Sequence, residues 1–189
     1  MKDKILEACI DLFGEKGYKE TSIQDITKQI GVTKGAFYYY YNSKQEILGD
    51  ICMSYIETQL EQQQVVLDNP SLDSKEKLYQ LVLIEIKSIK NERGSARIFF
   101  RDMRNIEDSQ LKEIKVKRNQ FRKNYQTLIN QGINNGEFKE SLDAEMLTFG
   151  ILGIANWTYY WFKPDGRMSE ESITDIFVDM ILNGITNDN

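Results

Sequence analysis

The sequence predicts an all-helical fold. Apolar residues recur three and four positions apart along almost the whole chain, which is the spacing that places them on one face of an α-helix. Only two prolines, Pro70 and Pro164, interrupt the 189 residues, and groups of turn-forming residues separate the helical stretches. Together these observations favour helices throughout.

The N-terminal part predicts a first helix and a short second one. The first helix should stop between Gly14 and Gly17, because glycine adopts the left-handed conformation that ends helices. Thr21 or Ser22 should cap the second helix, which we expect to end near Gln29. The apolar stripes of these two helices comprise Ile5, Cys9, Leu12, Phe13, Ile23, Ile26 and Ile30.

A tight turn and a third helix should follow. Gly31 makes the turn, and Thr33 caps a helix from Lys34 to about Tyr40. Ser43 then caps a long fourth helix. Beyond a turn at residues 68–71, we expect a helix from about Leu78 to near Gly94, a short helix around Ile98 to Phe100, a long helix from about Asp108 to Asn134, an apolar helix from Ala144 to Phe162, and a last helix capped by Ser169.

Composition excludes several functional classes. The sequence has no histidine, so a Ser–His or Cys–His pair and an imidazole metal site cannot form. Cys9 and Cys52 lie among apolar residues at helical spacing, as small buried side chains do. We therefore expect no enzyme and no cofactor. Acid pairs such as Asp102 and Asp108 are the weak enzymatic alternative.

The chain also lacks the patterns that direct a protein to a membrane. It has no run of about 18 apolar residues, which a membrane-spanning helix requires. Its first residues mix acidic side chains into the apolar pattern, unlike a signal peptide. We expect a cytoplasmic protein with no membrane partner.

The helix after Thr33 is the candidate for reading DNA. Gly35 and Ala36 are small enough to let a backbone approach base edges, and the following tyrosines offer donors for phosphate oxygens. Phe37 and Tyr41 lie four positions apart and should pack inward together. A short helix cannot bury all four consecutive tyrosines, so the others should stay at the surface. Lys34, Gly35, Ala36, Tyr38 and Tyr39 would then face outward.

Two further observations bear on this helix. The net charge of the chain is −5, but three lysines and one aspartate between residues 21 and 45 give that segment a charge of +2. A small basic footprint of this kind fits binding that depends on shape and on a second subunit. In the alternative interpretation, Tyr38 to Tyr40 pack against the first helix and a partner subunit.

At these residues the sequence resembles the N-terminal domain of the TetR family of bacterial transcriptional regulators. Gly31 and Val32 form the turn, and Gly35, Tyr38, Tyr41 and Lys44 follow at intervals of three. Tyr41 departs from the family, which usually has phenylalanine there. The resemblance implies DNA contacts at Ser22, Gln24, Thr33, Lys34, Gly35, Tyr38, Tyr39, Tyr40 and Lys44, with Lys34 and Tyr39 at base edges and the others at phosphates.

The same resemblance implies a homodimer on a palindromic operator in double-stranded DNA. Helix-turn-helix proteins gain affinity when two recognition helices bind half-sites about one helical turn apart. Small residues in the penultimate helix would allow two subunits to approach closely, and the last two helices are unusually apolar. The predicted dimer interface comprises Gly150, Gly153, Ile154, Phe177, Met180 and Ile181.

The middle helices are expected to enclose a small lipophilic ligand. Arginines three and four apart share one face of two consecutive helices and could grip phosphates, although a solvated surface is the default explanation of such stripes. Residues Asn156 to Gly184 resemble the tail of TetR-family regulators that respond to acyl-CoA thioesters. The predicted ligand residues are Phe99, Arg101, Arg104, Arg118, Phe121, Arg122, Tyr125, Trp157 and Trp161.

The sequence thus predicts a helix-turn-helix DNA-binding domain at residues 1–46 and a helical ligand-binding and dimerisation domain at residues 47–189, joined by a long helix. The favoured function is a repressor that a lipophilic effector such as an acyl-CoA releases from DNA. One alternative is a repressor that senses cationic lipophilic drugs, with Glu85 or Glu92 beside aromatic faces. Another is a DNA-anchored scaffold that binds a protein partner.

Overall fold

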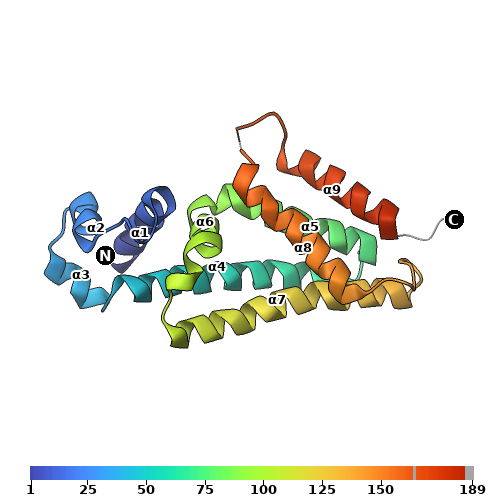
Figure 1. The fold of residues 1–189 in the computed structure, drawn as a ribbon, viewed down its shortest axis with the longest axis horizontal. Coiled ribbons are helices and arrows are strands. Elements are labelled where there is room, and N and C mark those ends of the chain that lie inside the picture. The colour runs from blue at the N-terminus through green and yellow to red at the C-terminus, as the bar shows by residue number, and fades with distance from the viewer. Residues whose placement is uncertain (164, 186–189) are drawn as a thin grey trace. The chain divides into compact units, whose positions relative to one another are not determined.

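The computed structural model describes residues 1–163 and 165–185, and this part of the chain forms helices and no strand (Figure 1). The all-helical prediction is confirmed. Pro164 and the last four positions of the predicted second domain lie outside the described residues. The elements are α1 (Lys2–Lys16), α2 (Ile23–Ile30), α3 (Lys34–Tyr40), α4 (Lys44–Leu67), α5 (Ser74–Asn91), α6 (Arg93–Asp102), the 3₁₀ turn η1 (Met103–Asn105), α7 (Asp108–Asn134), α8 (Ala144–Trp161) and α9 (Glu170–Ile185).

One predicted boundary is wrong. Gly94 does not end α5, which stops at Asn91, but lies inside α6. A β-carbon at this position would lie 2.6 Å from Cγ2 of Ile10 on α1. Gly94 is therefore a point of close helix contact rather than a helix terminator.

The described chain divides into two compact units. Unit 1 comprises residues 1–57 and 92–117. It contains α1 to α3, the first part of α4, α6 and the beginning of α7. Helix α1 packs against both α2 and α6. Buried apolar side chains of this unit include Ile5, Cys9, Phe13, Ile26, Phe37, Ile47, Leu48, Cys52, Ile98 and Phe99.

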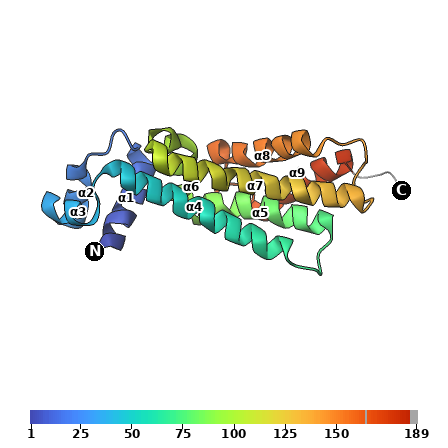
Figure 2. The same cartoon turned by 90° about the horizontal axis from the view of Figure 1, so that it is seen from below.

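Unit 2 comprises residues 58–91 and 118–189. Helix α5 packs against α8 and α9, which lie beside it in Figures 1 and 2. The core is apolar and includes Leu78, Leu81, Val82, Ile86, Tyr125, Leu128, Ile129, Phe138, Ile151 and Ile173. Ion pairs between Lys87 and Glu171 (2.9 Å) and between Lys90 and the buried Glu170 (3.0 Å) connect α5 to α9.

Among the described helices, none combines the length and the apolar character that crossing a membrane requires.

Candidate nucleic-acid interface

Local interactions fix the beginning of α2. The hydroxyl of Ser22 accepts a hydrogen bond from the backbone N–H of Asp25 (3.1 Å), and Oδ2 of Asp25 accepts one from the backbone N–H of Ser22 (2.8 Å). This reciprocal pair is a capping box, so Ser22 rather than Thr21 is the cap. The Thr21 hydroxyl instead donates to the carbonyls of Gly17 (2.8 Å) and Leu12 (3.3 Å).

The turn between α2 and α3 has the geometry that the sequence predicts. Gly31 has φ 69° and ψ 35°, the left-handed conformation that glycine adopts at little cost. Two residues later, Oγ1 of Thr33 accepts a hydrogen bond from the N–H of Ala36 (3.2 Å) and caps α3. The two short helices are thus held by caps and by a turn that local sequence specifies.

Helix α3 turns one side into unit 1 and the other to solvent. Phe37 and Tyr41 are 0% and 2% exposed, and their ring centroids lie 6.3 Å apart. Tyr38 and Tyr39 are 53% and 81% exposed. Tyr40 is half-buried and meets the ring of Tyr39 edge-on at 4.9 Å. The phenols of Tyr38 and Tyr39 are therefore accessible to a ligand as large as a DNA duplex.

The other predicted contact residues lie around these phenols. Ser22, Gln24, Thr33, Lys34 and Gly35 are all exposed, on or next to α2 and α3. Lysine and glycine at the beginning of α3 leave its N-terminal backbone open, as a helix that enters a groove requires.

Lys44 has a different environment. Its ammonium group donates to the carbonyls of Tyr18 (2.8 Å) and Thr21 and lies 4.4 Å from the centroid of the Tyr18 ring. Burial lowers the pKa of this lysine, an effect that the nearby thiol and carboxyl groups partly oppose. Two of the three N–H groups of Lys44 thus hold the segment between α1 and α2, and one remains for another acceptor.

In unit 1, two arginines of α6 bind the last turn of α1. Arg97 donates to the carbonyl of Gly14 (3.1 Å), and Arg101 donates to the carbonyl of Phe13 and pairs with Asp102 (2.9 Å). Cations at a helix C-terminus are stabilising. The predicted ligand residue Arg101 is thus already engaged, and Phe99 is buried against the ring of Tyr55 at 5.0 Å.

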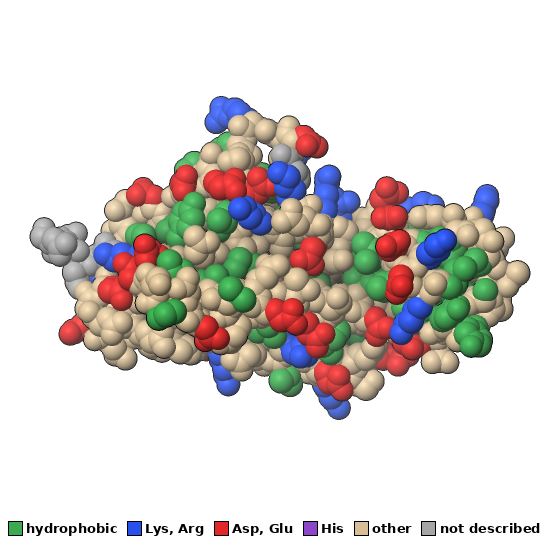
Figure 3. Space-filling view, turned by 180° about the vertical axis from the view of Figure 1, so that it is seen from behind, with side chains coloured by type: hydrophobic (Ala, Val, Ile, Leu, Met, Phe, Trp, Pro, Cys, Tyr) green, Lys and Arg blue, Asp and Glu red, His purple; other side chains and the backbone are tan. Residues whose placement is uncertain are grey.

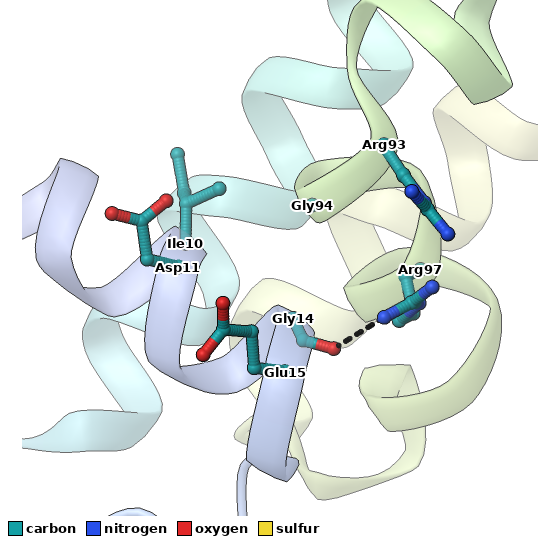
Figure 4. Close-up of a pocket in the computed structure, with 7 residues that line it drawn as sticks. All are labelled: Ile10, Asp11, Gly14, Glu15, Arg93, Gly94 and Arg97. Carbon is teal, nitrogen blue, oxygen red and sulfur yellow. Dashed lines mark hydrogen bonds between the residues drawn. The ribbon is translucent and has the colours of Figure 1, made fainter. Parts of the chain in front are cut away.

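Figure 4 shows the surface pocket where α1 and α6 cross. It has a volume of about 360 Å³. Asp11 and Glu15 come from α1, and Arg93 and Arg97 from α6, so acidic and basic side chains line opposite walls. Both helices have a glycine at the crossing, Gly14 and Gly94.

Unit 2 brings some of the predicted ligand residues together and leaves others at its surface. The rings of Phe121 and Tyr125 lie 5.7 Å apart. Arg122 pairs with Glu145 (3.0 Å) and lies over the ring of Phe149. The exposed residues of this set are Arg118, Trp157 and Trp161 in unit 2, and Arg104 is the exposed one in unit 1.

Unit 2 contains buried polar groups, of which the sequence analysis named Glu85 and Tyr125 but neither of the glutamines on α4. Glu85 is buried, and the hydroxyl of Tyr125 donates to its carboxyl. Burial raises the pKa of Glu85 to about 8, although the hydrogen bond from Tyr125 lowers it. Gln59 and Gln63 on α4 are buried as well. Their spacing of four, which continues the stripe through Tyr55, was the available signal.

Exposed apolar side chains gather on α8 and α9. The view from behind shows hydrophobic side chains in several places between charged ones (Figure 3), whereas α8 lies on the opposite side, which faces the viewer in Figure 1. Of the predicted interface residues, Met180 is 54% exposed, and a β-carbon added to Gly150 or Gly153 would meet nothing within 4 Å. Ile154 and Phe177 are half-buried, whereas Ile181 is 6% exposed and belongs to the subunit core. Further exposed apolar residues on these two helices are Met146, Phe149, Trp157, Tyr160, Trp161 and Ile176.

The fold, the capped helix-turn-helix and the exposed face of α3 define a DNA-binding transcriptional regulator, not an enzyme. Comparison with known families agrees. The family model described as "Bacterial regulatory proteins, tetR family" matches residues 5–51, and the one described as "Tetracyclin repressor-like, C-terminal domain" matches residues 71–185. The second match covers more than half of the chain, and the protein belongs to the TetR family.

Relatives include the HTH-type transcriptional repressor KstR2 of Mycolicibacterium smegmatis, 23% identical over 98% of this chain and 90% of the relative. The structure of the ketosteroid transcriptional regulator KstR2 of Mycobacterium tuberculosis has a TM-score of 0.91 and 21% identity, over 99% of this chain and 95% of that chain. The structure of AibR in complex with isovaleryl coenzyme A and operator DNA has a TM-score of 0.86 and 25% identity, over 95% and 96% of the two chains.

Proposed function

We propose that this regulator is a homodimeric repressor that binds a palindromic operator through α3 and is released by a lipophilic effector. The observation that most supports this proposal is the exposed face of α3, where Lys34 and the phenols of Tyr38 and Tyr39 reach solvent. The helix itself is held rigidly by its cap and by core packing. Lys34 and Tyr39 would reach base edges. Ser22, Gln24, Thr33, Gly35, Tyr38, Tyr40 and Lys44 would contact the DNA backbone.

The test compares Lys34→Ala with Lys28→Ala, another exposed lysine of the same module that lies outside α3. Fluorescence anisotropy would measure binding to the duplex that the wild type selects from a random pool and to a scrambled duplex. Lys34→Ala should lower the preference for the selected duplex by about 1–3 kcal/mol, because a base contact is lost. Equal losses on both duplexes would remove Lys34 from the base-reading role.

An acyl-CoA is the effector class that we favour. The complex of AibR with isovaleryl coenzyme A, a structure similar to this chain, supports it. A cationic drug would lack an ionised carboxylate to pair with, because the buried carboxyl of Glu85 has a pKa of about 8 and is mostly uncharged at neutral pH. Release of the labelled operator by acyl-CoAs, and not by cationic dyes, would support this choice. Release by the dyes alone would reverse it.

Contacts within unit 1 offer a route for such a release. Arg97 and Arg101 attach α6 to the last turn of α1, so a displacement of α6 would move α1 and the helices packed on it. An effector acts in this way only if it binds one of the two arrangements more tightly. We further propose that residues 1–46 and 47–189 are the DNA-binding and effector domains, and that the protein works in the cytoplasm.

A further inference from the structure

Helix α4 carries two buried glutamines one helical turn apart. Gln59 is 2% exposed and Gln63 is 1% exposed. Within the described part of the chain, neither amide atom of Gln59 has a hydrogen-bond partner, and neither does Nε2 of Gln63. Oε1 of Gln63 accepts a hydrogen bond from Nδ2 of Asn124 on α7 (2.9 Å). One acceptor oxygen and two amide nitrogens on the same face of α4 thus lack partners.

Stability of the fold does not account for these side chains. Buried polar atoms in native proteins are almost always hydrogen-bonded, because an unmade bond in the interior costs free energy. An apolar side chain of similar length at position 59 would avoid that cost. Groups that a subunit leaves unsatisfied in its interior are those that a bound molecule can satisfy.

The side chain that hydrogen-bonds Gln63 is a neutral amide. Asn124, which bonds Gln63, precedes Tyr125, whose hydroxyl donates to the carboxyl of Glu85. The two hydrogen bonds, of Asn124 with Gln63 and of Tyr125 with Glu85, involve no lysine and no arginine. An ionised ligand group held by the glutamine amides alone would lack a compensating charge, which is costly in an interior. A neutral group is the better match.

The glutamine atoms that lack partners determine which hydrogen-bonding groups the neutral ligand must have. An amide nitrogen of glutamine donates hydrogen bonds, and its oxygen accepts them. A secondary amide has one carbonyl acceptor and one N–H donor, which point to opposite sides when the amide is trans. Its carbonyl can accept from the nitrogens of both Gln59 and Gln63, and an N–H of the same ligand can donate to the oxygen of Gln59. A hydrocarbon chain offers neither group.

We propose that Gln59 and Gln63 bind an uncharged amide of the effector, an inference that rests on the ligand-released function proposed above. The pantetheine arm of an acyl-CoA contains amides of this kind. The two glutamines would hold this arm, and apolar side chains of unit 2 would contact the acyl chain. Gln59 is then a ligand-binding residue that unit 2 retains at the expense of its own stability.

The first experiment needs no ligand. Gln59→Met removes the unsatisfied amide at nearly constant length, and Gln62→Met makes the same change at an exposed position of α4. The melting temperature of the free protein should rise by about 2–6 °C in Gln59→Met and stay unchanged in Gln62→Met. A fall in the melting temperature of Gln59→Met would mean that the amide is satisfied inside the subunit, and it would overturn the assignment.

The second experiment measures binding of octanoyl-CoA and of octanamide by isothermal titration calorimetry. Both should bind the wild type and Gln62→Met, and both should bind Gln59→Met at least about tenfold more weakly, because a buried polar partner is lost. Undiminished binding to Gln59→Met, or no binding of either compound to the wild type, would overturn the assignment.

The binding results distinguish a failure of the amide site from a failure of the proposed acyl-CoA effector. If only octanamide binds, and Gln59→Met abolishes that binding, the amide site stands and the acyl-CoA class is wrong. If octanoyl-CoA binds Gln59→Met as tightly as the wild type and releases DNA from both, the acyl-CoA class stands and the amide site is wrong.

Discussion

Lys44 serves the fold of the helix-turn-helix module whether or not it also touches DNA. Its ammonium group holds two carbonyls of the segment between α1 and α2 and lies over the ring of Tyr18. Hydrogen bonds from a charged group stabilise more than neutral ones. The lysine at this position therefore connects the first turn of α4 to the beginning of α2.

Replacing this side chain should lower stability as well as DNA affinity. Lys44→Ala should reduce the free energy of unfolding in urea by about 1–2 kcal/mol, because charge-assisted hydrogen bonds are lost at a half-buried position. If the remaining N–H also binds phosphate, the salt dependence of DNA binding should flatten by about one unit. Lys28→Ala is the control for stability, and equal unfolding curves for the two variants would contradict the structural role.

Glu85 makes stability depend on pH. Its pKa is 4.5 in an unfolded chain and about 8 in the folded one. Between these values the folded state holds a proton that the unfolded state has lost, so the free energy of unfolding falls as pH rises. Below pH 4.5 and above pH 8 the contribution of this group is constant.

Glu85→Gln keeps an oxygen that can accept from Tyr125 and cannot ionise. Relative to this variant, the wild type should lose on the order of 3 kcal/mol of stability between pH 5 and pH 8. Urea unfolding of both proteins across that range checks the difference, since all other titrating groups are common to them. Parallel pH profiles would show that the Glu85 carboxyl ionises normally.

The crossing of α1 and α6 depends on close contact between two helices. Gly14 and Gly94 face each other there, and a β-carbon at Gly14 would lie 3.3 Å from Cα of Gly94. Arg97 and Arg101 add hydrogen bonds to the same end of α1. Side chains larger than hydrogen at this crossing would separate the helices and weaken those bonds.

Gly94→Ala tests this contact. Alanine favours a helix by about 1 kcal/mol over glycine, but its methyl group would overlap the side chain of Ile10, and such overpacking costs about 1–3 kcal/mol. We expect a net loss of stability in urea unfolding. In an Ile10→Ala background the substitution should do less harm, and purely additive effects would mean that the two residues do not meet.

We expect the dimer to depend on the exposed apolar side chains of α8 and α9. Trp157 on α8 and Met180 on α9 are 62% and 54% exposed, more than side chains of this kind usually are. Two subunits must present their α3 helices to successive half-sites. A substitution that weakens the dimer should therefore weaken DNA binding as well.

Met180→Glu should raise the dimer dissociation constant by about 30-fold or more, which corresponds to about 2 kcal/mol, because it places a charge in the predicted interface. Light scattering after size exclusion measures the mass, and anisotropy measures operator binding. Val65→Glu is the control, because Val65 on α4 is 74% exposed outside the predicted interface. A Met180→Glu protein that remains dimeric would place the interface elsewhere.

Sequence patterns determined the helices and which face of α3 is exposed. Capping residues such as Ser22 and Thr33 and the left-handed Gly31 act over three or four positions, and the alternation between Phe37, Tyr38 and Tyr41 decides which phenols reach solvent. Interactions of such short range are visible in sequence because both partners lie in one motif.

Tertiary structure alone decided how distant side chains pair. Lys44 bonds carbonyls near residue 20, and Arg101 donates to the carbonyl of Phe13. From the sequence, Lys44 was a candidate phosphate contact, and Arg101 was either a solvated surface charge or a phosphate contact. Nothing in the sequence indicated that the side-chain amide of Gln59 would lack hydrogen-bond partners. The periodicity of a helix says which face is buried, but not which backbone or side chain lies opposite, and hydrogen bonds depend on that partner.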